Sequence, residues 1–287
     1  MLRAAVLWSC LGFAALNAAS PVPLTAPVVA PDPVLQAAVE AIDARLRARW
    51  QIGDDRVAVA LHDFTTDRTA LLHPDRIDYA ASLPKIAILL AWFEAHPEAA
   101  RNLDPATRHE LGLMIKVSDN AMATKYSRAL GLDAIQATLA RYHFYDAASG
   151  GGLWMGKHYG QGGERRPDPF GGHSHAATVR QVLRFYLLLE RGQLVSPEAS
   201  ARMKEIFASP DIGHVRDKFV LGLAGRDREI LRKAGWWEDW RHDSALIRGG
   251  GRHYVLVALT RHPQGEDYLV ALAPAIDDLL APTADPR

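Results

Sequence analysis

The sequence predicts a mixed α/β (α+β) fold, in which both ends of the chain build a mostly antiparallel sheet and an all-helical subdomain is inserted between its strands. Two observations lead to this prediction. Strand-like patterns occur near both ends of the chain, whereas the long middle part shows apolar residues at helical spacing. The chain has 287 residues and no internal repeat, so we expect one unit with two subdomains around a single cleft.

The first predicted elements are a helix and a hairpin. Asp32-Pro33 makes a favourable helix start, because proline suits the first helical position. Apolar residues then keep one face of this helix, namely Leu35, Val39, Ile42 and Leu46. Strand-like runs follow at 56–64 and 69–72, and the turn-rich sequence TTDR between them predicts a hairpin.

The remaining elements follow from the same patterns. Helical spacing continues in several pieces over 83–142 and again over 178–207, with a glycine-rich loop at 150–172 between them. Strands are predicted at 229–234, 243–248 and 254–260, before a last helical stretch around 267–280. Helices at the two ends of the chain are therefore expected to flank the sheet.

The composition is that of an ordinary globular protein. The 33 basic residues balance 33 acidic ones without a dense basic run, so nucleic acid, whose phosphates demand a basic surplus, is not expected as a partner. The single cysteine, Cys10, lies in the leading apolar segment. The rest of the chain therefore has no thiol for a disulfide, a nucleophile or a zinc ligand, and no cofactor is expected.

Residues 1–20 have the pattern of a secretory signal peptide, with a short positive start, a mostly apolar stretch and small residues at 18–20. The alternative is an uncleaved anchor, but the apolar run is shorter than the roughly 20 residues that span a bilayer. The proline-rich residues 21–32 predict an extended tether, which leaves 33–282 as the folded domain. We therefore expect a periplasmic or secreted protein without a membrane span after cleavage.

A lysine stands directly before the most apolar helical pattern of the chain. The sequence YAASLPK places Ser82 and Lys85 three residues apart, and the following run 86–93 is apolar on all sides. In one interpretation Lys85 extends into solvent and Ser82 caps the helix. In the other, burial lowers the proton affinity of Lys85, whose amine shares a helix face with Ser82 and takes the proton of its hydroxyl.

Two further motifs follow this pair. A Ser-Asp-Asn sequence begins at Ser118, at a break between helical stretches, and a Lys-Ala-Gly sequence begins at Lys233, on a predicted strand. In this order the three motifs resemble Ser-x-x-Lys, Ser-Asp-Asn and Lys-Thr-Gly of the class A β-lactamase and penicillin-binding protein superfamily. The resemblance covers residues 34–280 in element order, and it implies a class A β-lactamase-like fold.

The resemblance implies catalytic roles for four side chains. Ser82 would be the nucleophile, and Lys85 would activate it. Ser118 would pass a proton to the leaving nitrogen of the substrate. Lys233, across the cleft, would keep Ser118 polarised and the pocket electropositive.

The resemblance also implies roles in substrate binding. Asn120 would hydrogen-bond the amide side chain of the substrate, while Asp119 would hold the turn in shape. Gly235 would let the substrate lie close along the strand. The backbone N–H groups of Ser82 and Trp236 would form an oxyanion hole.

Three departures from the family pattern bear on substrate and mechanism. Ala234 replaces the threonine of Lys-Thr-Gly, which removes a hydroxyl that helps to bind the substrate carboxylate. The segment between Lys85 and Ser118 is short for the family, which removes part of one wall of the cleft and leaves room for a wider or differently shaped substrate. The Glu-x-x-Leu-Asn motif that supplies the base for deacylation is missing, because no asparagine follows Asn120.

Glu164 is the nearest substitute for that base by its position in the chain. Its alternative interpretation is a solvated loop residue paired with Arg165 or Arg166. His173 and His175 alternate as metal ligands do, but no third ligand is indicated by the spacing, which favours capping of the loop.

Several aromatic residues also have two interpretations. Trp236, Trp237 and Trp240 either stack a substrate at the edge of the cleft or pack the hairpin. The glycine-rich loop suits a mobile lid that carries Trp154, and it is equally compatible with an irregular loop.

These observations together predict an exported serine acyl-hydrolase that forms an acyl-enzyme on Ser82 and acts on a small molecule. The expected substrate is a β-lactam or a related amide or ester. The alternatives are a D,D-carboxypeptidase or esterase acting on cell-wall peptides and a β-lactam-binding protein that stays acylated.

Overall fold

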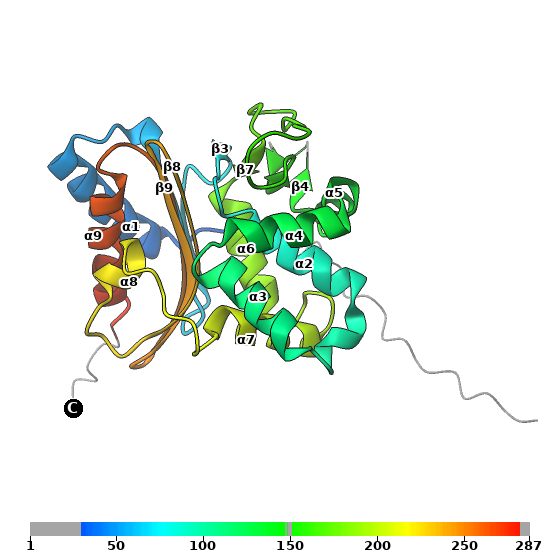
Figure 1. Cartoon of the computed structure of the whole chain (residues 1–287). Coiled ribbons are helices and arrows are strands. Elements are labelled where there is room, and N and C mark those ends of the chain that lie inside the picture. Colours follow the sequence, from blue (N-terminus) through cyan, green and yellow to red (C-terminus); the bar gives the residue numbers. More distant parts are fainter. Residues whose placement is uncertain (1–29, 147, 149–150, 282–287) are drawn as a thin grey trace, which may run out of the picture.

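The computed structural model describes residues 30–146, 148 and 151–281 (Figure 1). The predicted signal peptide, 1–20, lies outside the described residues, and so does the predicted tether except for its last three positions, 30–32. None of the helices in the described part of the chain combines the length and the apolar character needed to cross a membrane.

A five-stranded antiparallel sheet forms the centre of the molecule. Its strands are β1 (Val57–Asp63), β2 (Arg68–Leu72), β8 (Glu229–Trp237), β9 (Trp240–Gly249) and β10 (Arg252–Arg261). Their order across the sheet is β2-β1-β10-β9-β8, so the first hairpin pairs with the last strand of the chain. The prediction of a sheet built from both termini is confirmed, because strands separated by about 190 residues share this ladder.

Helices from the two ends of the chain cover one face of the sheet, as expected (Figure 1). They are α1 (Pro33–Trp50), α8 (Lys218–Gly222) and α9 (Gly265–Leu279). The Asp32 carboxylate caps α1 by accepting a hydrogen bond from the Leu35 N–H at 2.8 Å. A buried bond of 2.7 Å from the Tyr268 hydroxyl to Asp43 ties α9 to α1.

The inserted subdomain packs on the other face (Figure 1). Its helices are α2 (Lys85–Ala95), α3 (Pro105–Lys116), α4 (Asn120–Leu130), α5 (Leu132–Arg141), α6 (Val179–Glu190) and α7 (Pro197–Ala208), with the 3₁₀ turn η2 (Pro97–Ala100) between α2 and α3. A second 3₁₀ turn, η1 (Asp54–Arg56), precedes β1. Every residue from Lys85 to Phe93 in α2 is buried, so this helix is enclosed on all sides as its apolar run predicts.

Two predictions for the middle of the chain need correction. The helical stretch over 178–207 is divided into α6 and α7, because Gly192 and Val195 adopt positive φ angles of 71° and 61° between them. The subdomain is not all-helical, since short strands frame its loop. These strands are β3 (Asp78–Tyr79), β4 (Tyr145–Asp146), β5 (Gly151–Gly152), β6 (Trp154–Met155) and β7 (His175–Ala177).

Candidate active site

Ser82 lies in a tight turn that leads into α2. The Leu83 N–H donates to the Ala80 carbonyl at 3.0 Å, and the Lys85 N–H donates to the Ser82 carbonyl at 3.3 Å. The interpretation of Ser82 as a helix cap is wrong, because Pro84 occupies that position and no side chain caps α2. The Ser82 hydroxyl is thereby left to face the pocket beside the helix.

Lys85 is fully buried, so the interpretation in which it extends into solvent is wrong. Its amine lies 3.2 Å from the hydroxyl oxygen of Ser82 and 3.2 Å from that of Ser118. It also donates to the backbone carbonyl of Ser118 and, at 2.7 Å, to the side-chain oxygen of Asn120. One amine thus connects the first two motifs of the sequence.

Burial lowers the pKa of Lys85 to about 7, and Asp119 opposes this shift only in part. Two of the acceptors around the amine, the Ser118 carbonyl and the Asn120 amide oxygen, cannot donate a hydrogen bond at these atoms. They hold two N–H bonds of the neutral amine, which leaves its lone pair for the Ser82 hydroxyl. The arrangement therefore suits proton removal from Ser82 near neutral pH.

Ser118 occupies the connection between α3 and α4. Its φ angle of 63° is unusual for a residue other than glycine, and it aims the hydroxyl toward both buried lysines. Asp119 stabilises this turn by accepting a hydrogen bond of 2.8 Å from the Met122 N–H at the start of α4. The position of Asp119 therefore suits the role of holding the turn in shape.

Lys233 reaches the same place from β8. Its amine donates to the Ser118 hydroxyl at 2.8 Å and to the Ala234 carbonyl at 2.6 Å. Burial is the main cause that holds the pKa of Lys233 well below its ordinary value, and the charges of Lys85 and Arg232 lower it further. Ser118 thus lies between two desolvated amines that can relay a proton through its hydroxyl.

A buried ion pair supports β8 beneath Lys233. The Arg232 guanidinium contacts both carboxylate oxygens of Asp243 on β9, at 2.7 and 2.8 Å, and it also pairs with Asp217. Asp243 additionally accepts a hydrogen bond from the Phe219 N–H at 3.0 Å. These contacts hold the strand residue next to Lys233 rigidly against its neighbours.

Replacing Asp243 with alanine is expected to lower the free energy of unfolding by about 3 kcal/mol, because the substitution leaves the buried Arg232 with an incomplete set of partners. Equilibrium denaturation in urea measures the change. Asp211→Ala is the control, since it removes a carboxylate from an exposed pair with Arg108. Equal and small changes in both variants would show that the buried pair does not stabilise the strand.

Gly235 brings β8 against the turn that carries Ser82. A Cβ atom at this position would lie 2.7 Å from the Ala80 carbonyl oxygen and 3.1 Å from the Ser82 nitrogen. The glycine is therefore required by close approach within the protein, and not only by the substrate as the resemblance implied. Ser82 and Trp236, whose N–H groups form the oxyanion hole that the resemblance implies, line the same pocket.

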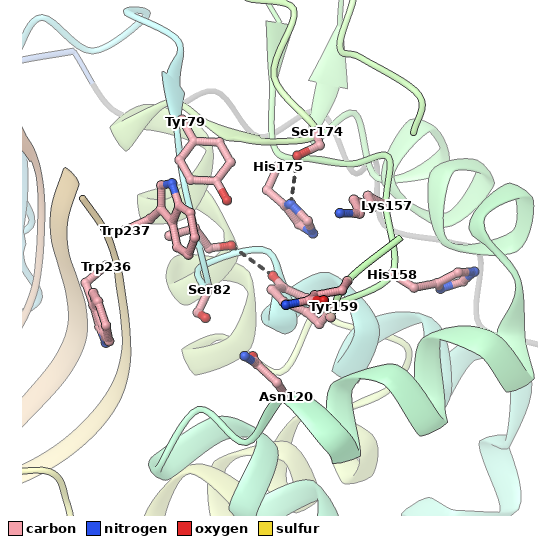
Figure 2. A pocket seen from close by; sticks show the side chains of 13 residues that line it. Tyr79, Ser82, Asn120, Lys157, His158, Tyr159, Ser174, His175, Trp236 and Trp237 are labelled. Carbon is pink, nitrogen blue, oxygen red and sulfur yellow. Dashed lines mark hydrogen bonds between the residues drawn. The ribbon is translucent and has the colours of Figure 1, made fainter. Parts of the chain in front are cut away.

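The pocket beside Ser82 has a volume of about 370 Å³. Its wall is formed by Tyr79, Ala81, Ser82, Asn120, Lys157, His158, Tyr159, Gly160, Gln161, Ser174, His175, Trp236 and Trp237. Figure 2 shows Ser82 between the two tryptophans on one side and the loop with Lys157 and His158 on the other. None of these described residues carries a carboxylate.

The two interpretations of the tryptophans apply to different residues. Trp236 and Trp237 are 64% and 54% exposed and line the pocket, where they are able to stack a ligand. Trp240 packs instead against Tyr79 and His173, with ring centroids 6.2 and 6.0 Å apart. The hairpin-packing interpretation therefore holds for Trp240.

Tyr159 is a site residue that the sequence did not indicate. Its hydroxyl donates to the Ala81 carbonyl at 3.0 Å, and its ring lies 4.4 Å from the Lys85 amine and 4.5 Å from the His175 ring (Figure 2). The ring therefore covers Lys85 from the loop side and contributes to its desolvation. The one signal for Tyr159 in the sequence is an aromatic side chain within a glycine-rich loop, which does not specify a contact with Lys85.

Glu164 lies outside this group. Its carboxylate is 59% exposed, pairs with Arg166 at 2.5 Å and does not line the pocket. This geometry matches the interpretation of a solvated loop residue and does not place the carboxylate where it could act as the deacylation base.

Trp154, in the glycine-rich loop, belongs to β6. Its indole N–H donates a hydrogen bond of 3.0 Å to the Arg166 carbonyl.

The two loop histidines have different environments, and the loop is capped by a carboxylate. Asp168 caps it by accepting hydrogen bonds from the backbone N–H groups of Phe170, Gly171 and His173. His175 belongs to β7, where burial lowers its pKa to about 4. Within the described residues, no group of three histidine, cysteine or acidic side chains is placed to hold a metal ion.

The chain is similar to known proteins in sequence and in fold. The model of a family described as "Beta-lactamase enzyme family" matches residues 97–279, and no curated protein matches the chain. A β-lactamase from Sphaerobacter thermophilus shares 18% identity over 84% of this chain and 95% of its own, with a TM-score of 0.67.

Two further solved structures have a similar fold. PBP-A shares 16% identity over 88% of this chain and 98% of its own, with a TM-score of 0.65. A class A β-lactamase from Bacteroides cellulosilyticus shares 13% sequence identity, and the match covers 85% of this chain and 98% of its own, with a TM-score of 0.66. The predicted class A β-lactamase-like fold is thereby confirmed.

Proposed function

The chain belongs to the beta-lactamase enzyme family, and from this premise we propose that it is an exported serine acyl-hydrolase that forms an acyl-enzyme on Ser82. One observation carries the proposal, which is the contact of 3.2 Å between the Ser82 hydroxyl and a buried Lys85 amine. Export is proposed from the signal-like pattern of residues 1–20.

The proposed reaction begins with proton transfer from the Ser82 hydroxyl to the neutral Lys85 amine. The Ser82 oxygen attacks the carbonyl carbon of a cyclic amide, and the oxyanion binds at the N–H groups of Ser82 and Trp236. Collapse of the tetrahedral intermediate breaks the C–N bond. The leaving nitrogen takes its proton from Ser118, which is replenished from a neighbouring lysine amine.

The proposed substrate is a β-lactam or a related amide or ester. A second candidate, a D,D-carboxypeptidase or esterase acting on cell-wall peptides, is favoured by Ala234, which lacks the hydroxyl that helps to bind a penicillin carboxylate in the family. A third candidate stays acylated without turnover. A mutant of PBP-A with this fold was solved as an acyl-enzyme complex with penicillin-G, which supports acylation as the shared step.

Intact-mass analysis after incubation with a chromogenic cephalosporin, at seconds and at an hour, separates non-binding, stable acylation and turnover. We expect an adduct on the wild-type protein and none on Ser82→Ala, with the modified peptide mapped to Ser82. Ser174→Ala is the control, because it removes another pocket hydroxyl and should retain the adduct. An adduct on a different residue, or one that persists in Ser82→Ala, would refute the proposal.

A further inference from the structure

Lys157 is the one lysine of the seven in the chain whose amine has no hydrogen bond or ion pair to any described residue. The other six donate to a hydroxyl, a carbonyl or a carboxylate. The unpaired amine does not lie on the open surface of the molecule. Lys157 is half-buried in the wall of the pocket beside Ser82.

The surroundings of Lys157 do not neutralise its charge. Among the residues that the structure describes, none that lines the pocket is acidic, and Glu164, nearby in the loop, is paired with Arg166. His175 is uncharged at neutral pH, because burial and the charges of Lys157, Lys85 and Arg165 lower its pKa to about 4. The loop side of the pocket is therefore electropositive.

The position of Lys157 relative to Ser82 decides which part of a substrate it meets. The leaving nitrogen takes its proton from Ser118, and neither Ser118 nor Lys233 lines this pocket. The pocket therefore receives the acyl part that stays bound to Ser82. Figure 2 shows Lys157 across the pocket from Trp236, with Ser82 between them.

We propose that Lys157 determines specificity by binding a carboxylate on the acyl part of the substrate, an inference that rests on the proposed function. The amine forms a charge-assisted hydrogen bond with this carboxylate, while the exposed faces of Trp236 and Trp237 contact its apolar portion. The shared chemistry is an acyl group with an anionic substituent, carried either by a β-lactam or by a peptide.

The test compares benzylpenicillin with α-carboxybenzylpenicillin, which adds one carboxylate to the acyl side chain. We expect the wild-type protein to be acylated about three- to tenfold faster by the carboxylated compound at equal concentration below saturation. Lys157→Gln should lose this preference, so that the two compounds acylate the variant at similar rates. Lys125→Gln, which removes the same charge from a surface pair with Glu110, should retain the preference. An unchanged ratio in Lys157→Gln overturns the proposal.

A second arm uses D-alanyl-D-alanine capped with glutaryl or pentanoyl groups, which distinguishes a peptide source of the carboxylate from a β-lactam source. Calorimetric binding of all four compounds to Ser82→Ala separates this inference from the proposed function. If the wild-type protein is not acylated at all, the proposed function fails. In each pair of compounds, the two penicillins and the two capped dipeptides, one member carries the extra carboxylate. If Ser82→Ala binds a carboxylated member more tightly and Ser82→Ala/Lys157→Gln does not, the inference is still supported. Equal binding of the two members in both pairs overturns it.

Discussion

Replacement of Lys85 by alanine is expected to lower the rate constant for acylation of Ser82 by about 10²- to 10⁴-fold, the usual contribution of a positioned base. The amine is the group of suitable pKa within 3.2 Å of the Ser82 hydroxyl. The variant should stay folded, because removal of a buried amine relieves its desolvation and offsets part of the hydrogen bonds lost at Ser118 and Asn120.

Stopped-flow acylation by a chromogenic cephalosporin across the pH range measures this effect. In the wild-type protein the acylation rate should rise as the pH increases through about 7, because Lys85 loses its proton there. In the Lys85→Ala variant this rise should be absent. Lys204→Ala, which removes a lysine paired with Glu190 far along the chain, is the control. A Lys85→Ala variant with near wild-type acylation would assign Lys85 a purely structural role.

The same pKa predicts how stability depends on pH. Lys85 has a pKa of about 7 in the folded protein and 10.5 as its ordinary value, so between these values the unfolded chain binds more protons. The destabilisation from its burial is therefore complete below pH 7, declines as the pH rises to 10.5 and is absent above it. Lys85→Ala should show a correspondingly flatter pH dependence of its unfolding free energy.

The second large effect is accumulation of the acyl-enzyme. Attack of water on the Ser82 ester needs a base, yet the pocket wall, as far as the described residues form it, contains no carboxylate, and Glu164 is exposed and paired with Arg166. His175 is uncharged, but a pKa of about 4 makes it a weak base. Loss of general-base assistance should slow deacylation by about 10²- to 10⁴-fold relative to an enzyme that has it.

A burst followed by a slow steady rate is therefore expected with benzylpenicillin, read by rapid-quench mass analysis. Glu164→Gln should leave both phases unchanged, because its carboxylate lies outside the pocket. A slower steady rate in Glu164→Gln would show that the loop moves to bring this carboxylate to the ester. Rapid turnover without a burst in both proteins would contradict the account, and Lys85 would then be the candidate to activate water.

Much of the candidate site followed from short-range sequence patterns. The spacing of Ser82 and Lys85 and the unbroken apolar run behind them predicted a buried amine beside a hydroxyl, and the structure places these groups 3.2 Å apart. Ser82 and Lys85 lie within one turn of each other, so local spacing and periodicity were sufficient to pair them. Ser118 was singled out by the Ser-Asp-Asn motif, whose role the family resemblance implied.

Features that depend on distant segments were missed or misjudged. Tyr159 covers Lys85 from a loop whose glycines show no periodicity, so no pattern predicted the contact. Gly235 was assigned to the substrate, whereas a Cβ there would collide with the Ala80 carbonyl. For Glu164 the sequence allowed two interpretations, and its contact with Arg166 selects the solvated loop residue.

The sequence by itself determined the order of the elements, the family motifs and the chemical identity of the groups at the site. Only the tertiary structure decided their electrostatics. Lys233 meets Ser118 across 115 positions of the chain, and burial of both lysines is what lowers their pKa values. Desolvation is a property of everything packed around a charge, and here that packing comes from segments far apart in the sequence.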